Sequence, residues 1–178
     1  MKRATKSVAK LVVLENNDRI SEETEEIQNR IRERAFKLSQ ERGHAGREVD
    51  DWLTAESEII NVPPADLIEK NGMFQVRMAI VGLDLEEMSV MASPQQMLVR
   101  GDYRHEDDQD DGTVHLCDFK PATVFRSIRF PQPIDVNSVD VAYQDGILRI
   151  MAAKEGAGQA RPKRTIARRA PAKRKRAS

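Results

Sequence analysis

The run that decides the fold spans residues 139–151 and reads VDVAYQDGILRIM. Apolar and polar residues alternate up to the dipeptide Asp145-Gly146, and a second apolar run follows directly after it. Asp-Gly between two such runs is a strong signal for a two-residue turn, because both turn positions need a positive φ angle. The sequence therefore predicts an antiparallel hairpin with strands at 139–143 and 147–151.

Alternation with a period of two continues upstream of this hairpin, and no helical pattern interrupts it. Glycine and proline residues separate several short apolar segments, which lie at 74–80, 88–92, 97–99, 114–118 and 124–130. Six or more short strands at such close spacing favour two sheets packed on one core. We therefore predict an all-β core at residues 62–153, folded as an antiparallel immunoglobulin-like β-sandwich.

Two helices are predicted before the sandwich. The first begins at Ser21, a residue type that caps helix N-termini, and ends at Gly43. Its apolar residues fall on one face: Ile27, Ile31, Ala35 and Leu38. The second starts at Val49 and is stopped by Pro63. Residues 21–61 thus form a short helical hairpin, too small to fold alone, that docks on the sandwich or on another chain. Residues 1–20 show no sustained period and are expected to be a flexible arm.

The charges are distributed unevenly along the 178 residues, although 29 basic and 29 acidic residues cancel. Residues 1–72 carry a net charge of −3, residues 73–153 of −6 and residues 154–178 of +9. Because this tail is also poor in apolar residues, we expect it to be disordered. It resembles basic arms that bind phosphates without sequence preference, and the candidate contacts are Arg161, Lys163, Arg164, Lys173, Arg174, Lys175 and Arg176. The alternative is a solvated tail or one that folds back on the acidic loop.

Several classes of protein are excluded by what the sequence lacks. No run of about 18 apolar residues is present, so no membrane contact is expected. The single cysteine, Cys117, rules out an internal disulfide framework and fits a reducing cytoplasm. No phosphate-binding loop or nucleophile-base set is found, so we expect neither an enzyme nor a cofactor. His115 and Cys117 share a strand face, but two ligands do not make a metal site.

Four segments, at residues 62–74, 98–101, 124–131 and 142–148, follow one another in an order that resembles the alpha-crystallin domain, the core of small heat-shock proteins. Residues 62–74 are similar to its opening, and Leu98–Gly101 to its L-x-I/V-x-G motif. Residues 124–131 keep the arginine of a third motif at Arg126, and 142–148 match the most specific one, A-x-x-N/D-G-V/I-L. The resemblance covers about 90 residues in the correct order. The helical hairpin is similar to a short bacterial domain of unknown function, at residues 31–38 and 51–56.

The resemblance implies an ATP-independent holdase chaperone that binds partly unfolded client proteins and suppresses their aggregation under stress. It implies a peptide groove lined by Leu98, Val99, Ile147, Leu148 and Ile150. Core burial of Leu148 and Ile150 is the simpler interpretation of those two residues, and it can hold together with the groove. It also implies a homodimer in which a strand at 114–118 is exchanged, with interface residues Val114, Leu116, Asp118 and Arg126. The tail lacks the I-x-I/V motif that builds large shells, so a dimer or small homo-oligomer is expected.

Some residues leave alternatives open. Arg126 is a charge on an apolar strand face and is costly there unless paired, so we expect Asp118 as its partner, or else an edge position from which it reaches water. Five methionines fill the core or offer adaptable contacts: Met73, Met78, Met88, Met91 and Met97. The alternative function is a nucleic-acid- or polyanion-associated protein that acts through its basic tail. A third interpretation makes the hairpin a docking module for a specific partner.

Overall fold

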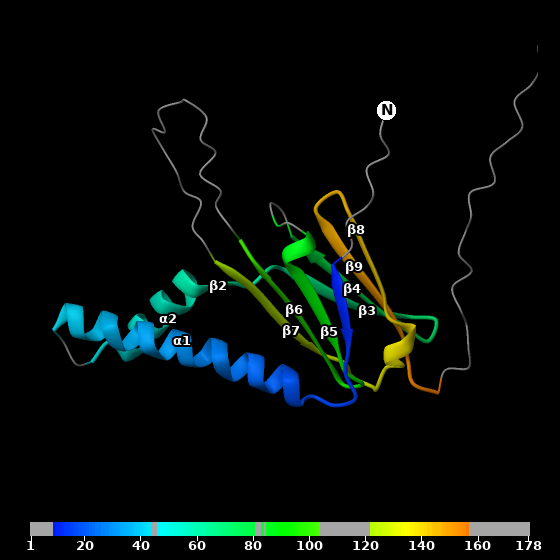
Figure 1. The fold of residues 1–178 in the computed structure, drawn as a ribbon, viewed down its shortest axis with the longest axis horizontal. Helices are drawn as coiled ribbons and strands as arrows, with labels where there is room; N and C mark the ends of the chain where they lie inside the picture. The colour runs from blue at the N-terminus through cyan, green and yellow to red at the C-terminus, as the bar shows by residue number, and fades with distance from the viewer. Residues whose placement is uncertain (1–8, 44–45, 81–82, 84, 104–121, 157–178) are drawn as a thin grey trace, which may run out of the picture.

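The computed structural model describes residues 9–43, 46–80, 83, 85–103 and 122–156. Two β-sheets pack face to face, and two helices lie on the outside of one of them (Figure 1). The five-stranded sheet has the strand order β1-β5-β6-β7-β2, and the four-stranded sheet has the order β3-β4-β9-β8. This arrangement confirms the predicted β-sandwich preceded by a helical hairpin.

The strands of the two sheets are short. The five-stranded sheet contains β1 (Lys10–Val13), β5 (Met88–Ala92), β6 (Gln96–Asp102), β7 (Thr123–Arg129) and β2 (Ile60–Asn61). The four-stranded sheet contains β3 (Ala65–Lys70), β4 (Met73–Ala79), β9 (Ile147–Ala153) and β8 (Asp140–Gln144). Two single turns of 3-10 helix, η1 (Leu85–Glu87) and η2 (Val136–Ser138), precede β5 and β8.

The hairpin of β8 and β9 is the one that the sequence predicts. Tyr143 lies opposite Leu148, and the turn residues Asp145 and Gly146 have φ angles of 53° and 78°. Two positive φ angles are what a two-residue turn of type I′ requires. Asn71-Gly72 joins β3 to β4 with the same signs, at φ 51° and 74°. Local turn chemistry therefore fixes the register of most of the four-stranded sheet.

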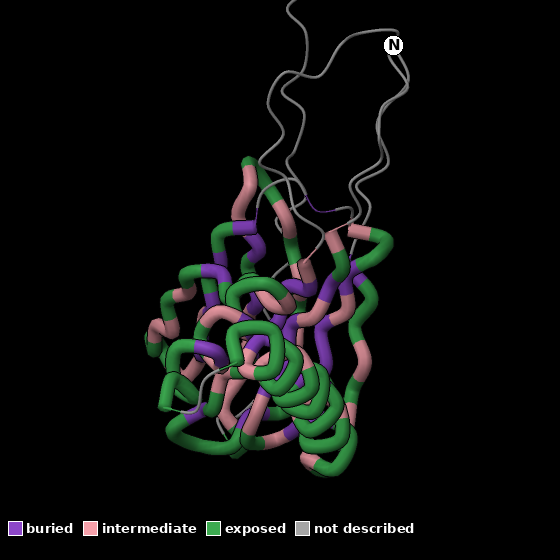
Figure 2. Tube along the Cα trace, turned by 90° about the vertical axis from the view of Figure 1, so that its left-hand side faces the viewer, coloured by how far each residue is buried: buried purple, intermediate pink, exposed green. Residues whose placement is uncertain are grey.

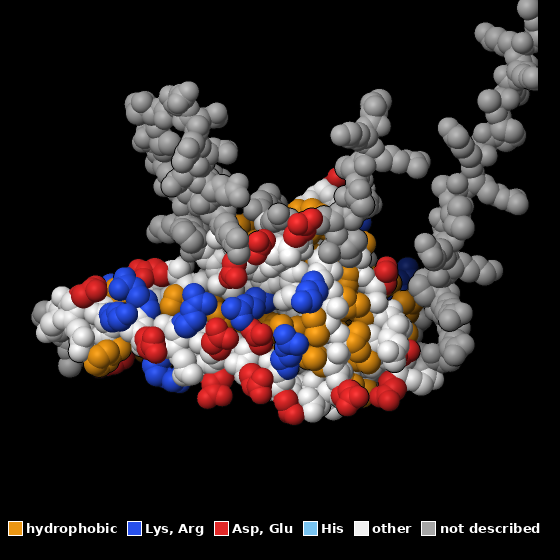
Figure 3. Space-filling view, in the orientation of Figure 1, with side chains coloured by type: hydrophobic (Ala, Val, Ile, Leu, Met, Phe, Trp, Pro, Cys, Tyr) orange, Lys and Arg blue, Asp and Glu red, His pale blue; other side chains and the backbone are white. Residues whose placement is uncertain are grey.

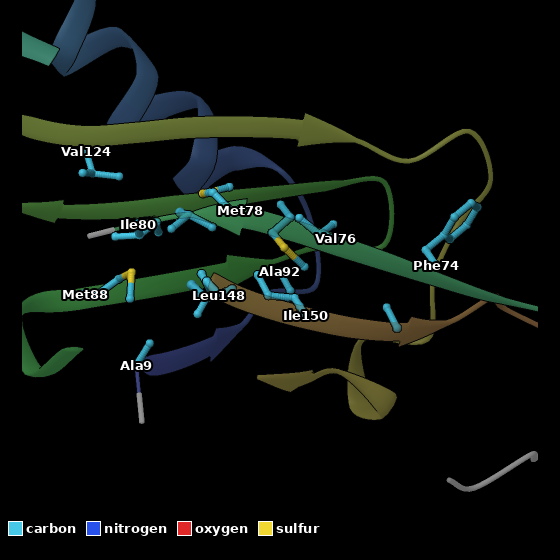
Figure 4. Packing of buried hydrophobic residues seen from close by; sticks show 14 of the residues in the cluster. Ala9, Phe74, Val76, Met78, Ile80, Met88, Ala92, Val124, Leu148 and Ile150 are labelled. Atoms are coloured by element: carbon cyan, nitrogen blue, oxygen red, sulfur yellow. The ribbon is translucent and has the colours of Figure 1, made fainter. Parts of the chain in front are cut away.

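The core of the sandwich lies between the two sheets (Figure 4). Its largest fully buried side chains include Phe74, Met78, Ile80, Met88, Met97, Ile134, Leu148 and Ile150. Four of the five methionines singled out in the sequence are buried, namely Met78, Met88, Met91 and Met97, and Met73 is half-buried. The core-filling interpretation is therefore the correct one for these four methionines.

The helices are α1 (Asp18–Arg42) and α2 (Glu48–Ile59). Gly43 ends α1 as predicted, with a φ angle of 67° and its N–H bonded to the carbonyls of Ser39 and Gln40. The predicted start at Ser21 is wrong by three residues. The N–H of Ser21 already donates to the carbonyl of Asn17 at 2.9 Å, and Ile20 is fully buried. Burial of Ile20 against the sheet thus extends the helix by most of a turn.

Residues 10–20 do not form the flexible arm that the sequence suggested. β1 pairs in parallel with β5, from Lys10 opposite Ser89 to Val13 opposite Ala92, and Ala9 is buried in the sandwich core. β2 likewise pairs in parallel with β7. The five-stranded sheet is therefore mixed, with parallel strands at both edges. A tight turn forces antiparallel pairing, and neither edge strand is joined to its neighbour by one, so parallel pairing is allowed.

The basic tail begins later than predicted, because Lys154 belongs to the sandwich. Its N–H donates to the Gly72 carbonyl at 3.0 Å, and it forms an isolated bridge with Ile134. Its Nζ pairs with Glu69 and lies 5.2 Å from the centre of the Phe74 ring. Residues 157–178, for which we expect disorder, lie outside the described residues.

Candidate functional site

The predicted groove residues do not lie together on one surface. Leu98 and Val99 are adjacent in β6 and face opposite sides of the sheet, where each is fully buried. Leu148 and Ile150 are buried between the two sheets, as the core-burial interpretation of these two residues expects. Ile147 alone of the five is partly exposed, and it lines a shallow hollow of about 290 Å³ on the outer face of the four-stranded sheet. The five side chains therefore do not line one open surface of the chain, and the client groove stays a prediction.

Exposed apolar surface is instead concentrated in the N-terminal segment. Among the described residues, the large hydrophobic side chains that are exposed all fall between residues 11 and 62: Leu11, Val13, Phe36, Val49, Leu53 and Val62. Three of them lie on the helices, where Phe36, Val49 and Leu53 are 63%, 72% and 56% exposed. Figure 3 shows hydrophobic surface in the region of β1 and charges of both signs along α1. Exposed apolar side chains gathered in one segment make that segment a candidate interaction site.

The helical hairpin covers the outer face of the five-stranded sheet. Met91 of β5, Leu98 of β6 and Phe125 of β7 form one buried cluster with four residues of α1 and one of α2: Ile20, Ile27, Ile31, Leu38 and Ala55. Trp52 and Val12 pack against this cluster. Figure 2 shows mostly exposed residues on the helices, which lie nearest the viewer, whereas α1 buries four residues on one side, as expected for an amphipathic helix on a sheet. We call this outer surface, Met91, Leu98 and Phe125, the covered face.

Polar contacts flank the covered face. The Arg100 guanidinium on β6 pairs with Glu23 of α1, and its Nη1 lies 3.8 Å from Glu26 Oε2. The two partners Arg100 and Glu23 are about one fifth exposed, so the ion pair lies at the boundary of the apolar contact. Ser93 is fully buried and its hydroxyl donates to the side-chain oxygen of Asn17, immediately before α1. These contacts fix the position of the helix on the sheet.

Ion pairs also join the two helices to each other. Arg42 Nη1 donates to Asp51 Oδ1 at 2.8 Å, and the Asp51 side chain is almost fully buried. Arg34 Nε donates to Glu58 Oε2 at 2.6 Å, and this hydrogen bond is the main cause that raises the pKa of Arg34. At the start of α2, hydrogen bonds from the backbone N–H groups of Glu48 and Gly46 lower the pKa of the Glu48 carboxyl. Ion pairs between α1 and α2 thus hold the two helices of the hairpin together.

Arg126 lies opposite Val99 in the pairing of β6 with β7, on the side of the sheet that faces the sandwich core. Its Nε atom is buried and has no hydrogen-bond partner within the described part of the chain. The residue as a whole is half-buried. Asp118, its predicted partner, lies outside the described residues.

Other predicted site residues also fall outside the described ranges. These are Val114, Leu116 and Asp118 of the exchanged strand and the seven basic residues of the tail: Arg161, Lys163, Arg164, Lys173, Arg174, Lys175 and Arg176. In residues 9–43, 46–80, 83, 85–103 and 122–156, no group of three or more His, Cys, Asp or Glu side chains could hold a metal ion. None of the helices in those ranges is both long and apolar enough to span a membrane.

Sequence reasoning missed two elements of this surface. The pairing of β1 with β5 was not predicted, although the run Leu11–Leu14 supplies an apolar signal for a strand. The coverage of the outer sheet face was also missed. Its signal is the apolar character of β5 and β6 on both faces, since Met91 and Leu98 are buried next to Val90 and Val99.

Two stacked sheets with a closed apolar core, and a helical hairpin over one outer face, define an immunoglobulin-like β-sandwich domain with an N-terminal helical extension. The chain belongs to the Hsp20/alpha crystallin family, whose model matches residues 66–167. The hairpin region, residues 26–60, matches a second family model, described as a protein of unknown function (DUF2934).

The chain is similar to several solved structures. Heat shock protein 16.0 from Schizosaccharomyces pombe is similar with a TM-score of 0.50 and 19% identity, over 56% of this chain and 92% of that chain. The Del-C4 mutant of hsp14.1 from Sulfolobus solfatataricus P2 has a TM-score of 0.44 and 26% identity, over 53% of this chain and 77% of that chain. A small heat-shock protein from Xylella fastidiosa has a TM-score of 0.44 and 17% identity, over 66% of this chain and 95% of that chain. No curated protein sequence matches the chain.

Proposed function

We propose that this chain is an ATP-independent holdase, which binds partly unfolded proteins and suppresses their aggregation. Membership of the Hsp20/alpha crystallin family supports a chaperone role. The observation that carries the proposal is the concentration of exposed apolar side chains on the N-terminal segment, with Phe36, Val49 and Leu53 on the outer sides of the helices. Unfolding clients expose apolar surface and unpaired strand edges, and such side chains bind the apolar surface of clients.

The first test measures light scattering of a heat-labile client, without ATP, in the presence of the full chain. A triple variant, Phe36→Ser, Val49→Ser and Leu53→Ser, removes apolar surface that the fold does not bury, so it leaves folding intact. We expect it to need several-fold more protein for the same suppression of scattering. The matched control replaces exposed polar residues of the same helices: Lys37→Ser, Gln40→Ser and Asp50→Ser. If the triple variant and the wild type suppress scattering equally, the client does not bind to Phe36, Val49 and Leu53.

A truncated chain separates the holdase activity from any contribution of the basic tail. The cut belongs after Gly156, because Lys154 and Glu155 donate backbone hydrogen bonds to Gly72 and Pro133. We expect the chain that ends at Gly156 to suppress aggregation at near-stoichiometric ratios, as the full chain does. Absence of suppression by both chains, with both folded, would show that the sandwich is not a holdase.

We also propose that the chain forms a homodimer or small homo-oligomer in which a second copy supplies an acceptor to Arg126. The buried Nε atom that lacks a partner in the described residues supports this. An unsatisfied buried donor costs about 1–3 kcal/mol, so an acceptor from a second copy would stabilise the assembly by a comparable amount.

A further inference from the structure

The covered face is apolar on a side of the sheet that does not face the sandwich core. Met91, Leu98 and Phe125 come from three adjacent strands and are 3%, 0% and 8% exposed. On the corresponding outer face of the four-stranded sheet, Arg77 and Arg149 lie directly opposite each other and are exposed, and no helix of the described ranges covers them. The outer face of the four-stranded sheet is thus polar enough to contact water, whereas the covered face is apolar and is stable only when another apolar surface packs on it.

The helix seated on the covered face shows which chemistry fits it. α1 presents Ile20, Ile27 and Ile31 in one stripe, and Glu23 lies at the edge of that stripe. Arg100, which lies in β6 two residues after Leu98, pairs with Glu23. The partner that this surface accepts is therefore an amphipathic helix with an apolar stripe and a carboxylate beside it.

The hairpin can leave this face without opening the sandwich core. The cluster under the hairpin and the cluster between the sheets have no residue in common. The hairpin is joined to the rest of the chain by two edge strands, and β2 pairs with β7 through two residues. The C-terminal half of α1 extends past the edge of the sheet, where it packs on α2 (Figure 1). Lifting the hairpin therefore breaks mainly the apolar contacts of the covered face, the Arg100 ion pairs and the hydrogen bond from Ser93 to Asn17.

We propose that the covered face is a binding surface for amphipathic helices of non-native proteins, and that α1 occupies it until such a helix displaces it. The identity of the competing helix rests on the proposed holdase function; the surface itself does not. Displacement requires only that the hairpin be lifted in a fraction of molecules, since a ligand that binds the open state shifts the equilibrium toward it.

The first experiment measures opening of the hairpin in the full chain. A thiol is placed under the helix by Met91→Cys in a Cys117→Ser background, and its labelling rate is followed. We expect Arg100→Glu to increase this rate at least tenfold, because it places like charges against Glu23 and Glu26. The double variant with Glu23→Arg restores the pair and should return the rate toward the starting value. Arg149→Glu, on the uncovered face, is the matched control. A rate that Arg100→Glu leaves unchanged contradicts the proposal.

The second experiment tests the surface with a defined helix. The probe is a fluorescein-labelled peptide with the sequence of residues 18–42, and fluorescence anisotropy measures its binding to the full chain. Ile27→Asp displaces the chain's own helix, which the emission of Trp52, the single tryptophan, reports independently. We expect this variant to bind the peptide at least tenfold more tightly than the wild type does. A peptide with serine in place of Ile20, Ile27 and Ile31 should not bind.

Outcomes of the two experiments separate this proposal from the holdase function. If Ile27→Asp does not fold, Arg100→Glu serves in the same binding assay. Peptide binding without suppression of client aggregation supports the surface while the holdase proposal fails. A heat-unfolded client should also slow labelling of the Met91→Cys thiol in the Arg100→Glu chain. Suppression of aggregation by that chain with no such protection, or no peptide binding by a chain whose hairpin is shown to be lifted, overturns the proposal.

Discussion

A Cβ atom on Gly101 would lie 2.6 Å from Cδ2 of Leu83. Gly101 lies in β6 opposite Met88, whose Cα atom would be 3.4 Å from the same position. The glycine of the Leu98–Gly101 motif is therefore needed for close approach and not for an unusual backbone conformation. Leu83, which precedes η1, closes the end of the sandwich core over this glycine.

Gly101→Ala should lower the free energy of unfolding by about 1–3 kcal/mol, because the added methyl group overpacks a closed core. Urea denaturation of the purified chain measures this. In the double variant with Leu83→Ala the clash is removed, so the two costs should not add, and the difference from additivity gives the coupling. Additive costs would show that Leu83 does not form the contact.

Asp51→Ala should destabilise the hairpin by about 2 kcal/mol, because the substitution removes a charged hydrogen bond to Arg42 at a site that is almost fully buried. Asp50→Ala is the control, since Asp50 is the exposed neighbour in the same turn of α2. Thermal unfolding followed by Trp52 fluorescence reports the difference. Similar shifts for both variants would mean that the loss of negative charge at the helix N-terminus, and not the pair, accounts for the effect.

The fold could be predicted where it is determined locally. The Asp145-Gly146 turn and the Gly43 helix end each depend on a positive φ angle, which a few adjacent residues specify. The parallel pairing of β1 with β5 could not be predicted, because it joins residues about 80 positions apart and no turn sets its register. Four apolar residues at 11–14 signal a strand but not its partner.

The candidate site was predicted less well than the fold, and for a physical reason. Adjacent residues in a strand point to opposite faces, so Leu98 and Val99 cannot both line one groove with their side chains. The sequence alone is enough to show this. The sequence does not show which of the two outer sheet faces the helices cover. That depends on how the stripe of Ile20, Ile27 and Ile31 packs on the covered face in three dimensions.

Because the pKa of Tyr103 is raised, we expect the free energy of unfolding to depend on pH in the alkaline range. Burial, and then the charge of nearby Tyr143, raise the pKa of Tyr103 above 10. A folded-state pKa above the unfolded value favours the protonated phenol in the fold, so this contribution is complete below pH 10 and is lost as the pH rises through the folded-state pKa. Tyr103→Phe should therefore flatten the fall in the free energy of unfolding between pH 9 and 11, measured in urea. A parallel decline in both proteins would contradict it.

Arg126→Ala should weaken self-association of the full chain roughly tenfold, because the proposed hydrogen bond from its Nε atom to a second copy is lost. Analytical ultracentrifugation over a concentration series measures the dissociation constant. Arg129→Ala is the matched control, since Arg129 lies in the same strand with an exposed side chain on the opposite face. Because an acceptor within the same chain would stabilise each copy and not the assembly, the two variants are also compared by thermal unfolding at low concentration. A loss of thermal stability without a change in self-association would assign the acceptor to the same chain, and no change in either would refute the pairing.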